Sequence, residues 1–212
     1  MDATVWGELL KLTVTLIAIV DPVASIPVFL AATDGLSNAE RRRVARLVSL
    51  TVFMVLAAAI LGGAQMLGFF GISIASFMIG GGILFLMLAV SMLQAKGSWI
   101  RQNPDEAMEA TEREGVAIVP LAVPLLAGPG AITTLIIETH ESPGLLGQLL
   151  LLLPAAAIAG IVWLALSAAE PLLRRLGRTG MNIITRIMGL IIAAIAIEYI
   201  YRGLVALFPK LV

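Results

Sequence analysis

The sequence lacks cysteine, has a single histidine (His140), and carries a charge on only 13% of its residues. Without cysteine, thiol catalysis, disulfides and cysteine-based metal sites are excluded. A lone histidine offers little for a metal site or a nucleophilic triad, and neither the G-x-x-x-x-G-K-S/T phosphate loop nor the H-E-x-x-H zinc motif occurs. The sequence therefore predicts a protein that is not an enzyme and has no cofactor or metal.

Apolar residues fill most of the remaining sequence. They make up 59% of the 212 residues, and the mean hydropathy is +1.01. These values exclude an ordinary soluble domain and predict a helical protein that crosses the membrane several times. The formal net charge is zero, which gives no indication of a nucleic-acid partner. Asp2 and Glu8 precede the first basic residue, unlike a cleaved signal peptide, so the first apolar run is expected to remain in the protein.

Long apolar runs predict six membrane spans, at residues 8–31, 44–68, 73–95, 116–139, 145–168 and 183–206. Eleven of the fourteen basic residues lie in the connections after the first, third and fifth spans or, in the case of Arg46 and Arg186, near the start of the second and sixth spans. By the positive-inside rule those connections are cytoplasmic. We therefore expect a multi-pass protein of the cell inner (plasma) membrane with both termini extracytoplasmic.

The chain divides into two halves of three spans each. Residues 1–95 form the first half and residues 116–212 the second, with an acidic, solvated cytoplasmic linker expected at 96–115. At an offset of 107 residues, Pro22 corresponds to Pro129. An odd number of spans inverts the second half relative to the first. The expected fold is therefore all-α integral membrane, with six transmembrane helices arranged as two inverted three-helix repeats.

The first span of each half contains a proline close to its middle, at Asp21-Pro22 and at Gly128-Pro129-Gly130. Proline has no N–H and moves the preceding residue out of helical geometry. The first and fourth helices are thus expected to be broken at mid-membrane; prolines that only kink the helices are the alternative. The backbone at a break binds a carboxylate at one helix end and a cation at the other. Breaks at matching places of inverted repeats point to the binding site of a secondary transporter.

The residues beside the two breaks suit a small ligand that carries one positive and one negative charge. Gly128 and Gly130 leave little side-chain bulk. Hydroxyl groups are supplied by Ser25, Thr133 and Thr134. A small amino acid carries the carboxylate and the ammonium group that two facing helix breaks bind. The sequence therefore indicates a small zwitterion as the ligand.

Three ionisable residues are candidates for coupling or gating. Asp21 has two compatible interpretations, as a cap of the half-helix that follows it and as the carrier of a coupling proton. Arg186 lies near the cytoplasmic end of the sixth span, where it either reaches the lipid headgroups or takes part in gating. Glu198 lies in the outer third of that span, where it either faces a cavity or pairs with a hydroxyl.

Two further groups have structural interpretations. The glycines at 80–82, together with Gly189, are expected to allow close packing of the third and sixth spans. Glu138, His140 and Glu141 lie at the outer mouth of the fourth span, where solvation at the membrane interface is a simpler interpretation than a metal site. Neither group is therefore included in the predicted binding site.

Three stretches resemble patterns of the MarC family of bacterial and archaeal inner-membrane proteins. Residues Asp21–Phe29 resemble its (N/D)-P-x-G-x-x-P-x-F signature, with Ala24 in place of the usual glycine. Residues Pro120–Ile132 closely resemble its second signature, and Arg186–Leu190 are similar to its pattern in the last span. The resemblance covers essentially the whole chain. It implies six spans, an inverted repeat, and discontinuous first and fourth helices.

The resemblance also implies a function, because family members with a known activity move small neutral amino acids such as glycine and alanine. It does not extend to Glu198, which stands where a glutamine is expected. When the family's site residues are transferred to the matching positions of this sequence, the implied substrate site is Asp21, Pro22, Ala24, Ser25, Gly128, Pro129, Gly130 and Thr133. Thr134 is added because it lies beside the break.

We therefore expect a secondary transporter that moves small neutral amino acids of the glycine, alanine and serine class by alternating access. Its expected partners are this substrate, a coupling ion (H⁺ or Na⁺) and the lipid bilayer. One alternative is an exporter of another small metabolite or drug. Another is a channel-like membrane protein, although the N-P-A pair typical of aquaporin-like breaks is absent.

Overall fold

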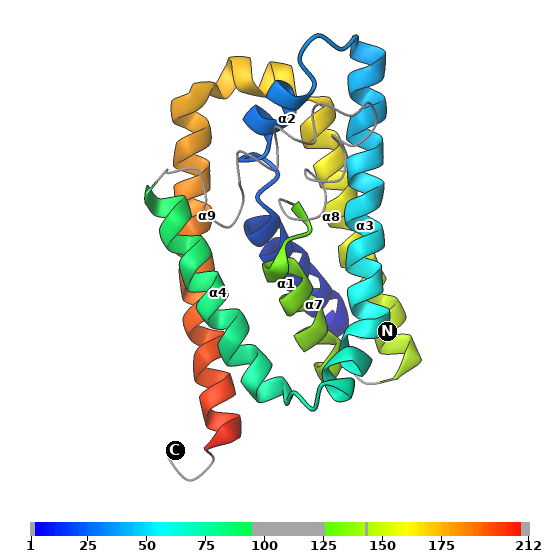
Figure 1. Cartoon of the computed structure of the whole chain (residues 1–212), viewed down its shortest axis with the longest axis vertical. Helices are drawn as coiled ribbons and strands as arrows, with labels where there is room; N and C mark the ends of the chain where they lie inside the picture. Colours follow the sequence, from blue (N-terminus) through cyan, green and yellow to red (C-terminus); the bar gives the residue numbers. More distant parts are fainter. Residues whose placement is uncertain (1–2, 95–125, 143, 209–212) are drawn as a thin grey trace.

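The computed structural model describes residues 3–94, 126–142 and 144–208 of the chain. All regular structure in this part of the chain is helical (Figure 1). The helices are α1 (Ala3–Val20), α2 (Ile26–Ala32), α3 (Asn38–Phe69), α4 (Ile74–Gln94), α7 (Pro129–Glu141), α8 (Leu145–Ser167) and α9 (Ala169–Leu207). The expected linker at 96–115 and the first part of the expected fourth span, residues 116–125, lie outside the described residues.

Four of the described helices are long and apolar enough to cross a membrane. They are α3, α4, α8 and the Thr179–Leu207 part of α9. These helices coincide with the expected spans at 44–68, 73–95, 145–168 and 183–206. The shorter helices α1, α2 and α7 occupy the parts of the sequence where the first and fourth spans are expected. The described protein is thus all-α with four candidate membrane spans.

Local sequence sets the ends of the long helices. At the start of α3, the Glu40 N–H donates to Ser37 Oγ (3.3 Å) and the Ser37 N–H donates to Glu40 Oε2 (2.8 Å), which is a capping box. Within α9, Gly177 has a φ of +63°, a conformation that glycine adopts without steric cost. The chain turns there, so the first part of α9 crosses the top of the molecule in Figure 1 before the rest descends.

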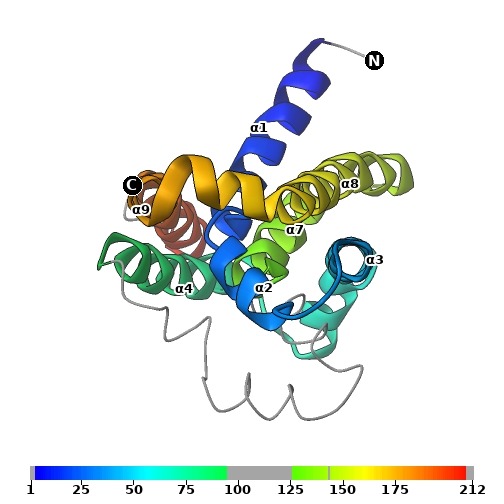
Figure 2. The same ribbon diagram turned by 90° about the horizontal axis from the view of Figure 1, so that it is seen from above.

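The two halves of the described chain make matching contacts. Helices α1, α3 and α4 alternate in direction, and they run opposite to α7, α8 and α9, respectively (Figure 1). Helix α3 packs on α8, and α4 packs on α9. Helix α3 also contacts α7, and its counterpart α8 contacts α1. In the same way, α4 contacts α7, and its counterpart α9 contacts α1 and α2. Seen from above, α2 and α7 lie between the α3–α8 pair and the α4–α9 pair (Figure 2).

Burial makes α7 the central helix and leaves the long helices with an apolar outer face. Every residue of α7 from Thr133 to Ile137 is buried. The long helices instead expose large apolar side chains, among them Met54, Leu61, Met87, Leu153 and Leu190. An apolar outer face around a filled interior is what a bilayer requires of a spanning bundle.

Helices α4 and α9 approach closely through glycines. A Cβ atom on Gly82 would lie 2.6 Å from Ile200 Cγ1 and 2.8 Å from the Ala196 carbonyl oxygen. Gly189 of α9 likewise packs on α4, whereas a Cβ on Gly80 would meet no atom within 4 Å. The predicted packing role is therefore confirmed for Gly82 and Gly189, while Gly80 is on the exposed face of α4.

Replacing Gly82 tests this packing. Gly82→Ala forces α4 and α9 apart, and overpacking of this kind typically costs about 1–3 kcal/mol. We expect a lower midpoint of thermal unfolding for the detergent-purified variant than for the parent protein. Gly80→Ala is the matched control and should leave the midpoint unchanged or slightly higher, because alanine favours helix more than glycine does. Equal midpoints for the two variants would contradict the close contact.

Candidate functional site

Helices α1 and α2 are separated by an interruption at residues 21–25. Asp21 begins the interruption with a φ of +41°, and it is the only non-glycine residue with a positive φ in the described part of the chain. Asp and Asn are among the residues that most readily adopt this conformation. Pro22 follows and has no N–H with which to continue the hydrogen bonding of α1. Helix α1 therefore ends at the Asp-Pro pair.

The interruption is folded on itself inside the protein. Asp21 and Ser25 are each 1% exposed, and Pro22 is buried with them, while Ala24 is half-buried. The Asp21 Oδ1 accepts a hydrogen bond from the Ala24 N–H (3.2 Å), and the Ser25 Oγ donates to the Pro22 carbonyl (2.7 Å). These contacts satisfy two backbone groups that are costly to bury alone. Asp21 thus caps the turn that leads into α2.

Helix α7 begins beside the end of α1. Gly128 is extended (φ −70°, ψ 175°), and Pro129 occupies the first turn of the helix. A Cβ atom on Gly130 would lie 2.6 Å from Phe85 Cε1 and 3.0 Å from Ile19 Cγ2, so no side chain fits there. Because Ile19 belongs to the last turn of α1, the two regions in which breaks are predicted lie side by side in the structure.

Two threonines follow on α7, and both are buried. The Thr134 Oγ1 donates to the Gly130 carbonyl (3.1 Å). The Thr134 side chain also lies near the hydroxyl group of Tyr199 of α9. Thr133 packs against Gly81 of α4. The predicted hydroxyl-bearing residues of α7 are therefore held between α4 and α9, close to the start of the helix.

The other two candidate residues for coupling or gating are both exposed on α9. Arg186 makes no ion pair or hydrogen bond with any of the described residues. Glu198 lines a cavity, as one of its two interpretations predicts. The structure thus groups most of the predicted substrate site around the end of α1 and the start of α7, and it places Glu198 in a second region.

That cavity has a volume of about 540 Å³ and lies between α1, α7, α8 and α9. Its polar lining comprises Glu8, Lys11, Thr15, Glu138, Glu141, Ser142, Glu198, Tyr199 and Arg202. Arg202 forms an ion pair with Glu141 and so joins α9 to α7. His140 is exposed, and the described residues contain no group of three or more potential metal ligands. In the sequence, Glu198 gave a signal of this cavity as a carboxylate within an apolar span, while Glu138 and Glu141 were placed at the outer mouth of the fourth span without a ligand-binding role.

The opposite end of the molecule is tied together by Arg41. Its Nη2 donates to the Thr33 carbonyl (3.4 Å), and its Nη1 lies 3.5 Å from Glu170 Oε2. The other carboxylate oxygen, Oε1, pairs with Arg174 Nη2 at 2.6 Å. Thr33 ends α2 and Glu170 lies in the first turn of α9, so Arg41 connects the two halves of the chain. Sequence reasoning counted Arg41 only as part of a basic segment.

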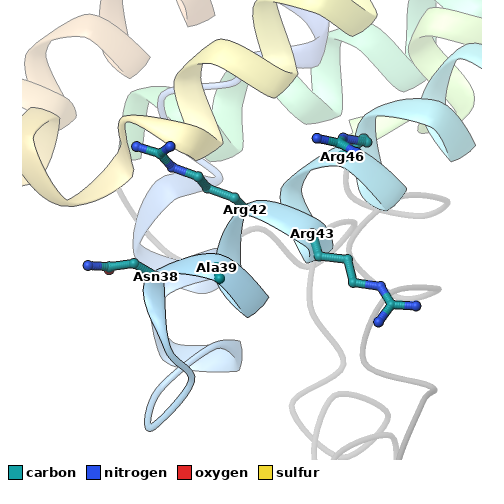
Figure 3. Close-up of a pocket in the computed structure, with 5 residues that line it drawn as sticks. All are labelled: Asn38, Ala39, Arg42, Arg43 and Arg46. Carbon is teal, nitrogen blue, oxygen red and sulfur yellow. The ribbon is translucent and has the colours of Figure 1, made fainter.

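The first turns of α3 carry a basic surface at this same end. Arg42, Arg43 and Arg46, with Asn38 and Ala39, line a hollow of about 550 Å³. Figure 3 shows that Arg42 and Arg43 extend to different sides of the helix. None of the residues around the interruption lines this hollow, so it is a charged surface separate from the predicted site.

The sequence is similar to those of known membrane proteins. The chain matches the family described as "MarC family integral membrane protein" over residues 6–208. The UPF0056 membrane protein YhcE of Escherichia coli (strain K12) is 40% identical over 204 residues, or 95% of this chain and 94% of the relative. The UPF0056 membrane protein YvbG of Bacillus subtilis (strain 168) is 33% identical over 199 residues, or 93% of this chain and 94% of the relative. A UPF0056 membrane protein of Archaeoglobus fulgidus is 35% identical over 190 residues, or 90% of this chain and 89% of the relative.

No solved structure matches the chain. The family match includes both stretches in which the sequence resembles a signature, Asp21–Phe29 and Pro120–Ile132. It also includes α3, α4, α8 and the spanning part of α9. The predicted resemblance is therefore confirmed, and the chain belongs to the MarC family of integral membrane proteins.

Proposed function

We propose that this protein is a secondary transporter that moves small neutral amino acids across the plasma membrane. The observation that carries the proposal is the contact between the end of α1 and the start of α7 at Gly130. A helix C-terminus such as that of α1, with the Asp21 carboxylate beside it, favours an ammonium group. The N–H groups in the first turn of α7 favour a carboxylate. An amino acid carries both groups a short distance apart.

The packing around Gly130 supports a small substrate. Phe85 and Ile19 occupy the space that a larger residue at this position would need. Ser25 and Thr133 are buried in the same central region and add hydroxyl groups that hydrogen-bond polar ligands. Glycine, alanine and serine suit such surroundings better than amino acids with long or branched side chains.

The arrangement of the two halves supports inverted repeats. Opposite helix directions and matching contacts are what a two-fold axis in the membrane plane produces. In this proposal α1 with α2 forms the first span, broken at mid-membrane by residues 21–25. Helix α7 is the second part of the fourth span, which is broken in the same way ahead of Pro129. Transport then follows from movement of one repeat against the other around the substrate.

Charge supports an orientation with both termini extracytoplasmic. Arg42, Arg43 and Arg46 lie on the first turns of α3, and Arg174 and Arg175 lie on the first part of α9. Both segments are at the top of Figure 1, while the two chain ends are in its lower half. The arginine-bearing end is cytoplasmic by the positive-inside rule.

The two ends of the molecule support a carrier rather than a channel. At the cytoplasmic end, Arg41 joins the end of α2 to Glu170 of α9. At the extracytoplasmic end there is a cavity of about 540 Å³. A carrier holds one end closed while the other is accessible, whereas a channel needs a path through both ends at once.

Counterflow in proteoliposomes tests the proposed activity. Vesicles that contain the purified protein and unlabelled alanine should transiently accumulate labelled glycine, alanine and serine from outside. Leucine, lysine and a lipophilic drug serve as comparators and should not accumulate, because the region around Gly130 has no space for them. Proton and sodium gradients imposed on the same vesicles identify the coupling ion. Absence of counterflow for every small amino acid, with protein that elutes as a folded species, would contradict the proposal.

The role of Asp21 in coupling is tested by Asp21→Asn. Asparagine retains the Oδ1 that accepts the Ala24 N–H and tolerates a positive φ, so the turn should persist. If Asp21 carries the coupling proton, the variant keeps counterflow but loses its stimulation by an imposed proton gradient. Asp34→Asn, at an exposed position, is the matched control. Full gradient stimulation in Asp21→Asn would remove Asp21 from the coupling role.

The contact of Arg41 with Glu170 is tested by exchange of charge. Arg41→Glu weakens closure of the cytoplasmic end. Because such partly exposed pairs contribute about 0.2–1 kcal/mol, labelling of Ser25→Cys from the cytoplasmic side should rise by up to about fivefold. The natural chain has no cysteine, so this thiol is the only one that reacts. The double exchange with Glu170→Arg should lower labelling again. Arg43→Glu, which changes the same charge on an exposed residue, should have no effect.

A further inference from the structure

The extracytoplasmic cavity is a defined space with charged walls. It opens between α1, α7, α8 and α9, at the end of the molecule that also holds both chain ends. Leu12 and Leu151 are among its apolar lining residues. Four carboxylates and two cations face it, supplied by Glu8, Glu138, Glu141 and Glu198 and by Lys11 and Arg202. At about 540 Å³ it has room for a small ligand and its water.

Most of these charges have no partner of opposite sign in contact with them. Arg202 pairs with Glu141. In the part of the chain that the structure describes, the side chains of Lys11, Glu138 and Glu198 make no ion pair. Charges in the wall of a cavity between apolar helices act on a ligand more strongly than charges in open water. The excess of carboxylates attracts an ammonium group and repels anions.

Tyr199 connects the wall of the cavity to the buried core of the protein. This side chain is 6% exposed and lines the cavity. Its ring packs against Phe85 with the centroids 5.6 Å apart, and its hydroxyl group lies near Thr134. Phe85 in turn contacts Gly130 at the start of α7. The rings of Tyr199 and Phe85 therefore lie between the cavity and the start of α7.

We propose that this cavity is a second, extracytoplasmic binding site for molecules that carry an ammonium group, with Glu138 and Glu198 as the residues that bind it. Lys11 provides a cation for the carboxylate of a zwitterion in the same site. The assignment rests on the proposed function, for which it supplies the place where an amino acid is held before it reaches the interruption. It selects for the amino group of the substrate, whereas the packing around Gly130 selects for size.

Protection of a thiol from labelling tests binding in the cavity without any need for transport. Ala194 lines the cavity, and Ala194→Cys places the only thiol of the chain there while keeping every charged residue. At a glycine concentration five times its dissociation constant, labelling by a membrane-impermeant thiol reagent should slow about sixfold, because it requires the empty site. Ethylamine, which has the ammonium group alone, should also protect. Glycolate, which has the carboxylate alone, should not.

Two carboxylate variants connect this protection to the named residues. Glu138→Gln together with Glu198→Gln should abolish protection by glycine. Glu198→Gln alone, at an exposed position, should weaken this protection and raise the KM for glycine added outside more than the KM for glycine inside. Asp34→Asn should retain full protection.

The outcomes separate this inference from the proposed function. The second site is overturned if the parent protein shows counterflow but neither glycine nor ethylamine protects the thiol. It is also overturned if glycolate protects as well as glycine does. In both cases the proposed transport function stands. Protection that depends on Glu138 and Glu198, in a protein without counterflow, supports the site and overturns transport.

Discussion

The contact of Gly130 with Phe85 and Ile19 is the constraint on which the rest of the arrangement depends. Because no side chain fits at Gly130, the first turn of α7 lies directly against the last turn of α1. Phe85 is carried by α4, and α4 is in turn fixed to α9 through the contact at Gly82. A series of close contacts thus runs from α9 through α4 to the region between the predicted breaks. Any movement of α4 with α9 changes the space available at Gly130.

The two ends of the molecule differ in a way that fits one step of a transport cycle. At the end that the proposal places on the cytoplasmic side, the Arg41 side chain is only 20% exposed, so its contact with Glu170 is partly shielded from water and salt. At the other end, charged side chains surround a cavity that has Tyr199 in its wall. In the proposed mechanism this arrangement corresponds to a state that faces outward and is closed above the interruption. The opposite state requires that the contact at Arg41 be broken and that the cavity shrink.

Features that depend on neighbouring residues could be predicted from the sequence, whereas most contacts between distant residues could not. Apolar length located four of the helices, and the geometry of proline located the end of α1, because both depend on neighbouring residues alone. A cavity was one interpretation of Glu198, but the rest of its lining was not predicted, since Lys11, Glu138 and Tyr199 come from three helices that only packing brings together. The start of α9 was also missed, because Gly177 bends that helix instead of ending it. The predicted linker lies outside the described residues.

The turn at residues 21–25 gives a physical reason for the first signature of the family. Its first position is Asn or Asp, and Asp21 has a positive φ that these two residues tolerate best. The usual glycine is replaced by Ala24, which does not have a positive φ, so its Cβ costs no backbone strain. The backbone N–H of this residue, which alanine and glycine share, is what Asp21 requires. The added methyl group therefore changes the space beside the interruption and leaves the turn intact. In the proposed transporter, this favours the smallest substrates.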